Sequence, residues 1–583
     1  MVYFLVPHLY SNMKKHRLHT SAALAVLLPL VSAQATTYTF NATTTSAAPG
    51  NTWSSGTGWN SVPQSAADTI LALGTSTTLA ASAALNTSQD VATPFLLNSL
   101  VNNYVGPNSG AQPNVTINNG GLRFVSNGAT TPTISLNASG NVKTNLIFNS
   151  AVTFDADTTI SGVSDLLFKE PTVVSGVTTN LGGVISNANN AVITKSGAGT
   201  LRIASDNPTY NGNYNVTAGV FQIGNNGSNG DAGTGTITLS GTGSMNVRRS
   251  GTLVINNTIA GTGNVKFETR ANASVTLNKA NTYVGTTTIS PTATTSTTNS
   301  QNGSVRLGID NALSISSVLT ITNGGDAVQT FNLNGFNQTL GGLTTTANGS
   351  ATNSKVALGA GTLTVNDAGN RTFAGQISGT GNVVKQGAGS WTLGSVNTYT
   401  GTTTISSGTL VLGAAGSINT SSLVTVDGGA TLTNNNTSAL TAAVALNEGA
   451  SLSGTGAFSP SSLSVVADLG NGYSPISAGS SLTKAGNLTF NLSGLSGITS
   501  EVTYSLFSGI PSGGFSGVSI GATALDSTDS NATFTGTVGD FTYLFNNSLN
   551  ALTITPIPEP AAAAALLGFA FMGMATLRRR RQA

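Results

Sequence analysis

Short segments in which apolar and polar residues alternate recur along the chain. Three clear examples are NVTINNGG ending at Gly121, LTITNGG ending at Gly325 and VTVDGG ending at Gly429. In each segment two apolar residues flank a threonine, so one row of side chains would face a core and the other would face solvent. The glycines that follow supply the positive φ angles that sharp bends need. The pattern predicts short β-strands separated by tight turns.

A longer unit built from such strands occurs three times. It reads as a Gly-rich turn, Val-Lys, a Gly-Ala-Gly turn, a strand, Asn-Thr-Tyr-x-Gly, a strand, a turn and a strand. Copies occupy residues 379–413, 261–290 and, in a worn form, 192–224. One copy is too short to bury a core by itself. Copies stacked on one another would bury a continuous apolar column.

These features predict an all-β fold, a right-handed parallel β-helix (β-solenoid) with β-rich caps. We expect coils of about 20–25 residues and strands about 4.8 Å apart. The alternative is a set of β-sandwiches, which also contain short strands and turn signals. The solenoid is favoured because the copies differ in spacing but keep the same order of strands and turns.

The sequence changes in character toward both ends, and this divides the chain. The expected parts are a signal peptide at 1–35, an N-terminal β cap with the first solenoid coils at 36–190, a repeat region at 191–435, a C-terminal β-rich region at 436–555, and a C-terminal signal with a single transmembrane helix at 556–583.

The charge pattern argues against binding of nucleic acid. Charged residues make up only 7% of the 583 residues, against about 25% in a typical domain. Seven of the 22 basic residues lie at the two ends, namely Lys14, Lys15, Arg17 and Arg578 to Arg581, which leaves 15 basic residues against 20 acidic ones. A nucleic-acid surface would need clustered Lys and Arg in the body of the protein.

The usual catalytic nucleophiles and bases are also scarce. The chain has no cysteine, so disulfides and thiolate metal sites are excluded. All three histidines, His8, His16 and His19, precede residue 20. A chain that has lost this segment has no imidazole for Ser-His-Asp or Cys-His catalysis or for a histidine metal site. We expect no cofactor and no metal.

The N-terminal segment has the three parts of a secretory signal. Basic residues follow Met13, which is the expected start, and an apolar stretch then leads to the small residues Ala33-Gln34-Ala35. We expect export by the Sec machinery and cleavage after Ala35, with Ala33 as the second choice. The alternative is a buried N-terminal helix.

The C-terminal segment has the composition of a membrane anchor. Residues 561–577 are apolar or small except for Thr576, which is the short limit for a membrane-spanning helix. Pro558 and Pro560 mark its start. The cluster Arg578, Arg579, Arg580 and Arg581 would stay on the cytoplasmic side.

This ending resembles the PEP-CTERM sorting signal of Gram-negative bacteria. The tripeptide Pro558-Glu559-Pro560, the apolar helix and the arginine cluster follow one another in the order of that signal. The resemblance implies transient anchoring in the inner membrane and processing by an exosortase-type enzyme near the tripeptide. It also implies an association with exopolysaccharide, and a final place at the cell surface or in the extracellular matrix.

The repeated unit resembles the autotransporter-associated β-strand repeat. The resemblance is strong at 385–413 and moderate at 192–224 and 261–290. It implies a passenger-like β-helix. An autotransporter ends in a membrane β-barrel with strands of about 10 residues, whereas this chain ends in an apolar segment and arginines. Self-translocation is therefore not implied.

A carbohydrate-active β-helix would need acids arranged for catalysis. Asp155 and Asp157 are two residues apart, and Asp526 and Asp529 share a polar segment, but neither pair has a basic residue near it in the sequence. We interpret both pairs as surface or turn acids. Asp231 lies in a single Gly-Asp turn, whereas calcium-binding turns occur in arrays.

Arginine, tryptophan and tyrosine side chains are the remaining candidates for a functional or structural role. We expect Arg248 and Arg249 at an exposed edge. Trp391 occupies the position of Leu201 in a related copy, so it should pack inward. Trp53 and Trp59 are candidates for contact with a glycan, although a cap also uses aromatic residues for burial. A recurring tyrosine should have a structural role at a corner, and its three copies are Tyr210, Tyr283 and Tyr399.

The expected function is that of an exported, non-enzymatic β-solenoid surface or matrix protein. It would be adhesive or structural, would be associated with exopolysaccharide or other cell-surface components, and would be sorted through its tail. The alternatives are a β-helix polysaccharide lyase or hydrolase, and a passive structural spacer.

Overall fold

The computed structural model divides the chain into two units by its contacts, Met1–Ala35 and Thr36–Ala583. The residues it describes are 35–41, 52–56, 58–75, 79, 83–106, 112–136, 143–168, 184–187, 190–270, 272–292, 302–471, 473–478, 482–484, 486–509, 511–530 and 532–558. In these residues the regular elements are β-strands and three short 3-10 helices, η2 (Ala351–Asn353), η3 (Leu469–Asn471) and η4 (Leu495–Gly497).

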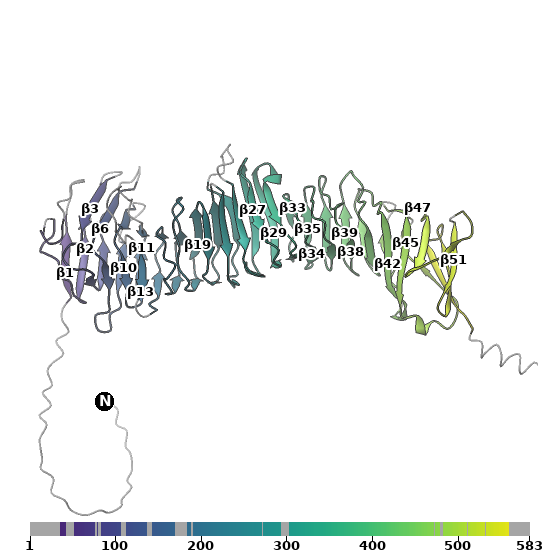
Figure 1. The fold of residues 1–583 in the computed structure, drawn as a ribbon, viewed down its shortest axis with the longest axis horizontal. Coiled ribbons are helices and arrows are strands. Elements are labelled where there is room, and N and C mark those ends of the chain that lie inside the picture. The colour runs from purple at the N-terminus through teal and green to yellow at the C-terminus, as the bar shows by residue number, and fades with distance from the viewer. Residues whose placement is uncertain are drawn as a thin grey trace, which may run out of the picture. The chain divides into compact units, whose positions relative to one another are not determined.

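The first coils of the second unit carry three parallel sheets (Figure 1). One sheet contains β1 (Thr36–Phe40), β2 (Thr69–Leu73), β5 (Ser99–Asn102), β8 (Thr133–Leu136), β11 (Thr158–Gly162), β14 (Ile193–Lys195), β16 (Tyr214–Val216), β18 (Ile237–Leu239) and β21 (Ile259–Gly261). The second contains β3 (Ala84–Ser88), β6 (Asn114–Asn118), β9 (Asn145–Phe148), β12 (Asp165–Phe168), β15 (Thr200–Ile203), β17 (Val220–Ile223), β19 (Ser244–Arg249), β22 (Val265–Thr269), β24 (Thr287–Pro291), β26 (Val318–Gly325) and β29 (Gly342–Gly349). The third contains β4 (Phe95–Leu97), β7 (Leu122–Phe124), β10 (Val152–Phe154) and β13 (Ile185–Asn187).

Three more parallel sheets and a short pair carry the stack onward. The fourth sheet contains β20 (Thr252–Ile255), β23 (Ala273–Leu277), β25 (Gly303–Leu307), β27 (Gln329–Asn332), β30 (Ser354–Ala357) and β33 (Gln376–Ser378). The fifth contains β28 (Gln338–Leu340), β31 (Leu363–Asn366), β34 (Val383–Gln386), β36 (Thr403–Ile405), β38 (Val424–Val426), β40 (Val444–Asn447), β42 (Ser462–Asp468), β45 (Asn487–Ser493) and β48 (Gly517–Ile520), with β49 (Thr523–Ala524) added at the edge. The sixth contains β32 (Arg371–Phe373), β35 (Ser390–Leu393), β37 (Thr409–Leu412), β39 (Thr431–Asn434), β41 (Ser451–Ser453) and β43 (Ser477–Ala478), and the short pair is β44 (Thr483–Lys484) with β47 (Ser512–Gly513).

The parallel pairing of the strands from β1 to β45 confirms a β-solenoid there and excludes the sandwich alternative for that part of the chain, because sandwich sheets are antiparallel. In the copy of the repeat at 379–413, strand partners lie about 20 residues apart, as in Val383↔Thr403, whereas Thr287 pairs with Leu319, 32 residues further on. Nearer the N-terminus the offset reaches 35, as in Ile160↔Lys195. The expected coil length therefore holds for this copy, whereas the first coils and the coil that follows Thr287 are longer. The right hand of the coil stays a prediction.

Apolar residues at equivalent positions stack from coil to coil inside the column. One such row follows the register Leu71↔Leu100, Leu100↔Ile134 and Ile134↔Ile160, and all four side chains are buried. The residues between them in each strand point outward. The alternation seen in the sequence is thus the alternation between interior and surface.

A buried asparagine at one corner joins three coils in each copy of the repeat. The amide of Asn397 donates hydrogen bonds to the carbonyl oxygens of Ser395 (3.0 Å) and Ser417 (3.1 Å), and its oxygen accepts one from the backbone N–H of Ile377 (2.9 Å). Asn207 and Asn281 make the same three kinds of bond. These side chains pair backbone groups that no strand pairs.

The recurring tyrosine is a second corner element, as its position predicted. The Tyr399 hydroxyl lies 2.6 Å from Thr403 Oγ1, which lies 3.0 Å from Ser421 Oγ. Tyr283 and Thr287 show the same 2.6 Å contact, and both tyrosines are fully buried. The worn copy lacks this threonine, and there Tyr210 reaches the carbonyl oxygen of Ala191 at 3.5 Å.

Lysine is the least expected interior residue. Lys385 is buried, and its ammonium group donates hydrogen bonds to the carbonyl oxygens of Gln386 (2.7 Å), Gly387 (2.7 Å) and Ser407 (3.2 Å). Burial lowers its pKa, and the charge of Asp367 opposes that effect. Lys195 occupies the same place in another copy and donates to the carbonyl of Gly197. In these two copies the lysine satisfies carbonyl groups of the Gly-Ala-Gly turn, whereas the lysine of the 261–290 copy, Lys266, is exposed and pairs with Glu268.

Glycine is required where the backbone of one coil touches the next. A Cβ built on Gly381 would lie 1.8 Å from the carbonyl oxygen of Gly361, and one built on Gly401 would lie 2.2 Å from that of Gly381. Three successive coils therefore stack glycine on glycine. This contact explains why glycine occurs in the Gly-Thr-Gly and Tyr-x-Gly parts of the repeat.

An antiparallel sheet closes the C-terminal end of the stack. It contains β46 (Val502–Ser505), β53 (Ala551–Pro556), β52 (Phe541–Asn546), β51 (Thr533–Val538) and β50 (Asp526–Ser527). The buried Lys484 of the last coils donates to the carbonyl oxygen of Asn547 (2.6 Å) and to Asn550 Oδ1 (2.8 Å), both in the turn between β52 and β53. Parallel coils continue to β48, well beyond residue 435, where the repeat motif weakens.

Replacement of Asn397 by alanine should destabilise the repeat region. It removes three hydrogen bonds and leaves the buried N–H of Ile377 unpaired, so we expect a loss of about 2–4 kcal/mol in the free energy of unfolding, measured by urea denaturation. Asn370 accepts one exposed bond, from the backbone N–H of Ser390 (3.0 Å). Asn370→Ala should therefore cost less than about 1 kcal/mol. Equal losses for the two variants would contradict this role of Asn397.

The buried Lys195 should make stability depend on pH. Burial lowers its pKa to about 8, whereas an unfolded lysine titrates near about 10.4. Between these two values the unfolded chain binds a proton that the folded chain does not, so the free energy of unfolding should rise with pH. Lys195→Met should reduce this rise, measured by denaturation at several pH values. Lys279 is exposed, and a Lys279→Met variant should keep the full rise.

Candidate functional site

Two columns of mainly hydroxyl side chains run along the outer face of one sheet. This sheet contains β32, β35, β37, β39, β41 and β43. The first follows the strand register through Ser390, Thr409, Thr431, Ser451 and Ser477. The second passes through Thr372, Thr392, Val411, Thr433 and Ser453. We call these ten residues, nine with a hydroxyl group and Val411 without one, the hydroxyl surface.

The hydroxyl surface is regular because the strands beneath it are in register. Neighbouring residues in a column are about 4.8 Å apart, and the two columns are about 6.6 Å apart, since they are two residues apart along each strand. Side chains of the opposite orientation, such as Trp391 and Leu410, are buried. Strands β35, β37, β39 and β41 contain no charged residue. The surface therefore offers neutral hydrogen-bonding groups at fixed spacing.

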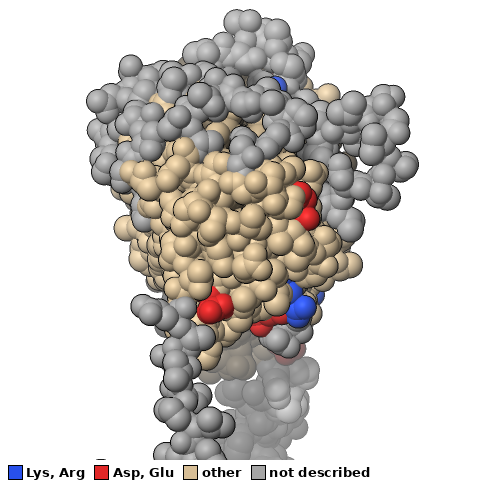
Figure 2. Space-filling view, turned by 90° about the vertical axis from the view of Figure 1, so that its left-hand side faces the viewer, with Lys and Arg blue, Asp and Glu red and all other residues tan. Residues whose placement is uncertain are grey.

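Some charged side chains elsewhere on the described surface pair between neighbouring coils. Arg202 Nη2 lies 2.8 Å from Asp165 Oδ2, and Arg248 Nε lies 3.5 Å from Glu268 Oε2. Figure 2 shows few charged side chains on the described part of the end that faces the viewer. Each such ion pair neutralises the charges of its two side chains, so these pairs add little to the electrostatic field that would attract a charged ligand.

Two of the four acids considered for catalysis, Asp155 and Asp157, are engaged in the fold. Asp155 forms an ion pair with Arg123, which lies on the neighbouring coil, so the carboxylate does have a basic partner that its sequence neighbours do not reveal. Asp157 Oδ1 accepts a hydrogen bond from the backbone N–H of Val192 (2.9 Å). Asp526 and Asp529 are exposed near the β50–β51 turn.

Asp231 is held in a polar corner. Its Oδ1 accepts a hydrogen bond from the backbone N–H of Gly233 (2.8 Å). Burial raises its pKa, the Gly233 bond lowers it, and Asp206 raises it further. Among the residues that the structure describes, no three His, Cys, Asp or Glu side chains come together in a way that would hold a metal ion.

The expectation that Arg248 and Arg249 share an exposed edge is wrong for Arg249. Arg248 is partly exposed, but Arg249 is only 5% exposed. The Arg249 guanidinium donates hydrogen bonds to the carbonyl oxygens of Gly230 (2.6 Å) and Thr252 (2.9 Å), and also to that of Ser228. Side chains alternate between surface and interior along β19, so the Arg249 side chain points inward. Carbonyl groups of the neighbouring loops compensate its charge there.

Trp53 and Trp59 lie inside the N-terminal cap. Trp53 is fully buried and its indole N–H donates to Thr87 Oγ1 (2.8 Å), while Trp59 is 7% exposed. The two ring centroids are 5.4 Å apart, and that of Trp59 lies 5.1 Å from the Phe40 ring. These rings have no open face on which a sugar would stack. Trp391 is buried as well, and its neighbour in register is Leu410.

The residues of the two terminal signals lie mostly outside the described residues. Ala35 is exposed and directly precedes β1, whereas Ala33 lies outside. Pro558 is exposed just after β53, at the end of the described chain. Glu559, Pro560, the apolar segment 561–577 and Arg578, Arg579, Arg580 and Arg581 lie outside. Within the described residues, no helix has the length and apolar character to cross a membrane.

The buried polar residues of the repeat and the hydroxyl surface were not predicted from the sequence. The buried Lys195, Lys385 and Asn397 had a signal, because each recurs at one position of the repeat. The hydroxyl surface had a weaker signal, the Thr-x-Thr spacing at residues 431–433. The columns themselves depend on which residues of neighbouring coils pair with each other. Coil length varies, so this pairing cannot be read from one segment of the sequence.

Comparison with known proteins agrees with this geometry for the repeats. Residues 193–223, 273–290 and 383–412 match a family model described as the passenger-associated-transport repeat. No curated protein and no solved structure matches the chain. The matched segments contain Lys195, Lys385, Tyr283 and Tyr399, together with the strands around them. These three parts of the chain are therefore similar to repeats found in autotransporter passengers.

Proposed function

We propose that the protein is an exported, non-enzymatic β-solenoid that serves as a surface or extracellular-matrix protein. The three passenger-associated-transport repeats and the parallel stack of strands fit a passenger-like β-helical surface protein. The repeated side chains that the structure describes hold one coil to the next. Function would then depend on the outward-facing residues.

The observation that carries an adhesive role is the hydroxyl surface. Each hydroxyl group makes only a weak net contribution when it binds a ligand in water. Contacts repeated along a rigid column add up, because binding at one site holds the ligand near the next. A neutral polymer that itself carries repeating hydroxyl groups is the matching ligand. We propose exopolysaccharide for this role.

A catalytic role has less support. Asp155 is paired with Arg123, and Asp157 binds a backbone N–H. Both carboxylates thus have structural partners, which a polysaccharide lyase or hydrolase would have to release. A passive spacer is the remaining alternative, and a binding measurement separates it from an adhesin.

The tail provides the proposed route to the surface. The tripeptide Pro558-Glu559-Pro560 would be acted on by an exosortase-type enzyme while residues 561–577 span the inner membrane and Arg578 to Arg581 remain in the cytoplasm. The exposure of Pro558 immediately after β53 supports access by such an enzyme. The proposed host is a Gram-negative bacterium that exports the chain through the Sec machinery.

Removal of hydroxyl groups should weaken binding to exopolysaccharide. The triple variant Thr392→Val, Thr431→Val and Thr433→Val keeps the β-branched shape and loses three hydroxyl groups. We expect its affinity for immobilised polysaccharide to fall about tenfold or more. The matched Thr→Ser triple variant should bind like the original chain. Equal binding by the two variants, no binding by the original chain, or release of soluble sugar would each contradict the proposal.

Removal of the tail should change where the protein is found. The intact chain should pass through an inner-membrane fraction before it reaches the surface, whereas a variant that ends at Ile557 should never appear in that fraction. Glu559→Ala keeps the apolar segment and should accumulate in the membrane in unprocessed form. Fractionation and mass spectrometry of the three proteins test this. Identical location and mass for all three would show that the sorting proposal is wrong.

A further inference from the structure

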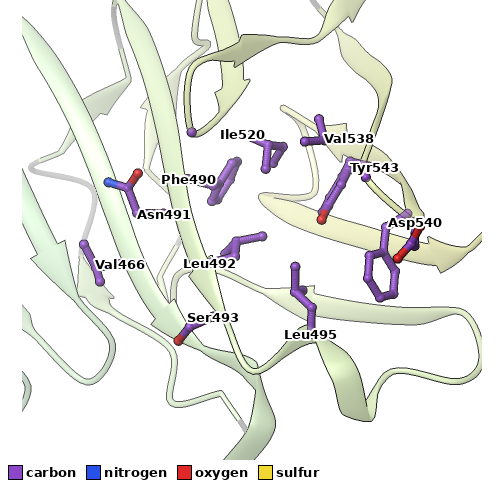
Figure 3. A pocket seen from close by; sticks show the side chains of 13 residues that line it. Val466, Phe490, Asn491, Leu492, Ser493, Leu495, Ile520, Val538, Asp540 and Tyr543 are labelled. Carbon is purple, nitrogen blue, oxygen red and sulfur yellow. The ribbon is translucent and has the colours of Figure 1, made fainter.

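A pocket of about 700 Å³ lies between the last coils and the C-terminal antiparallel sheet (Figure 3). Phe490 and Leu492 of β45 line one side, and Leu495 and Val538 line others. Phe541 and Tyr543 of β52 complete the apolar part. The pocket forms because the sheet of β50 to β53 runs antiparallel and does not continue the coil.

Several apolar side chains of this pocket are incompletely buried. Leu492, Leu495, Val538 and Phe541 are only partly buried, and Val466 is 40% exposed. Elsewhere in the described column the inward apolar residues are buried almost without exception. Partly exposed apolar side chains that gather in one hollow mark a contact surface. The pocket therefore offers an apolar surface to a partner or to another part of the chain.

The chain itself leaves the fold at the rim of this pocket. The backbone N–H of Ile557 donates a hydrogen bond to the carbonyl oxygen of Asp540 (2.8 Å), and Pro556 pairs with Phe541. Asp540 and Phe541 both line the pocket. The apolar segment 561–577 begins three residues after Pro558.

The reach and size of the nearest bulky residues match the pocket. Leu566 is eight residues after Pro558, which spans about 12 Å as a helix and up to about 28 Å when extended. The pocket volume is that of a site for a small ligand. It would hold a few side chains, such as Leu566, Leu567 and Phe569, and not the whole segment.

Charge favours the same occupant. From residue 446 to residue 558 the acidic residues are Glu448, Asp468, Glu501, Asp526, Asp529 and Asp540, and the one basic residue is the buried Lys484. The segment that follows ends in Arg578 to Arg581. Opposite charges on the two parts would hold the segment near the region that carries the pocket.

We propose that the pocket holds the first bulky side chains of the chain's own C-terminal segment, Leu566, Leu567 and Phe569, whenever that segment is outside a membrane. The segment would otherwise expose a long apolar surface to water. The pocket shields part of it next to the point of exit. This inference does not depend on whether the column binds a polysaccharide.

Disulfide trapping tests the proposal, because the natural chain has no cysteine. The full-length double variant Val538→Cys and Ala565→Cys places one thiol in the pocket and one in the segment. The matched control is Thr537→Cys with Ala565→Cys. Thr537 is the adjacent residue of β51, is exposed, and points to the opposite face. Mild oxidation in detergent-free buffer at about 1 µM protein favours closure within one chain, because tethered thiols have effective concentrations of about 1 mM.

We expect the Val538 variant to form the intramolecular disulfide, read from the mass and mobility of the monomer, at several times the yield of the Thr537 control. Leu492→Asp places a charge in the pocket and should reduce that yield. Leu544→Asp, on the exposed face of the antiparallel sheet that contains Val538, should not. Circular dichroism verifies that each variant is folded. Equal yields for the two cysteine pairs would overturn the proposal. Covalent dimers formed through Val538→Cys would also overturn it, since the segment of a second copy would then fill the pocket.

Discussion

The parallel pairing of each strand with its equivalents in the coils before and after it is the constraint on which the structure depends. Because pairing is in register, each residue meets a residue of the same position in the neighbouring coil. Apolar residues therefore form rows such as Leu71, Leu100 and Ile134. Glycines stack wherever two backbones touch, as at Gly361, Gly381 and Gly401. A coil is stable only when its neighbours match it.

The same constraint explains why polar residues enter the interior. Strands pair their backbone groups with the next coil, but corners do not, so the corners need side chains that donate and accept. Asn397, Tyr399 and Lys385 supply these groups within one copy of the repeat. The asparagine and the tyrosine recur in all three copies, and the lysine recurs in two, since Phe267 takes its place in the third. The repeat motif thus describes how coils attach to each other, and residues between its motif positions include those that face outward.

The sequence carried enough information for the interior and too little for the surface. Alternation predicted the strands, and the common slot of Trp391 and Leu201 predicted that both are buried, as they are. The partner of Asp155 was not predictable, because Arg123 lies 32 residues away and coil length varies in that region. Arg249 was misjudged because two adjacent arginines look alike until the register decides which one turns inward. The hydroxyl surface needs the same register, which local pattern does not contain.

The antiparallel end of the solenoid has a consequence for assembly. A bare last coil would present a row of free backbone groups on which a strand from any other chain could grow. Here β48 ends against β49, which runs in the opposite direction, and Lys484 fixes the closing sheet to the coils. At this end a second molecule thus finds no parallel coil on which to continue the stack. The closing sheet disfavours fibre growth from the C-terminal end of a protein made almost wholly of stacked strands.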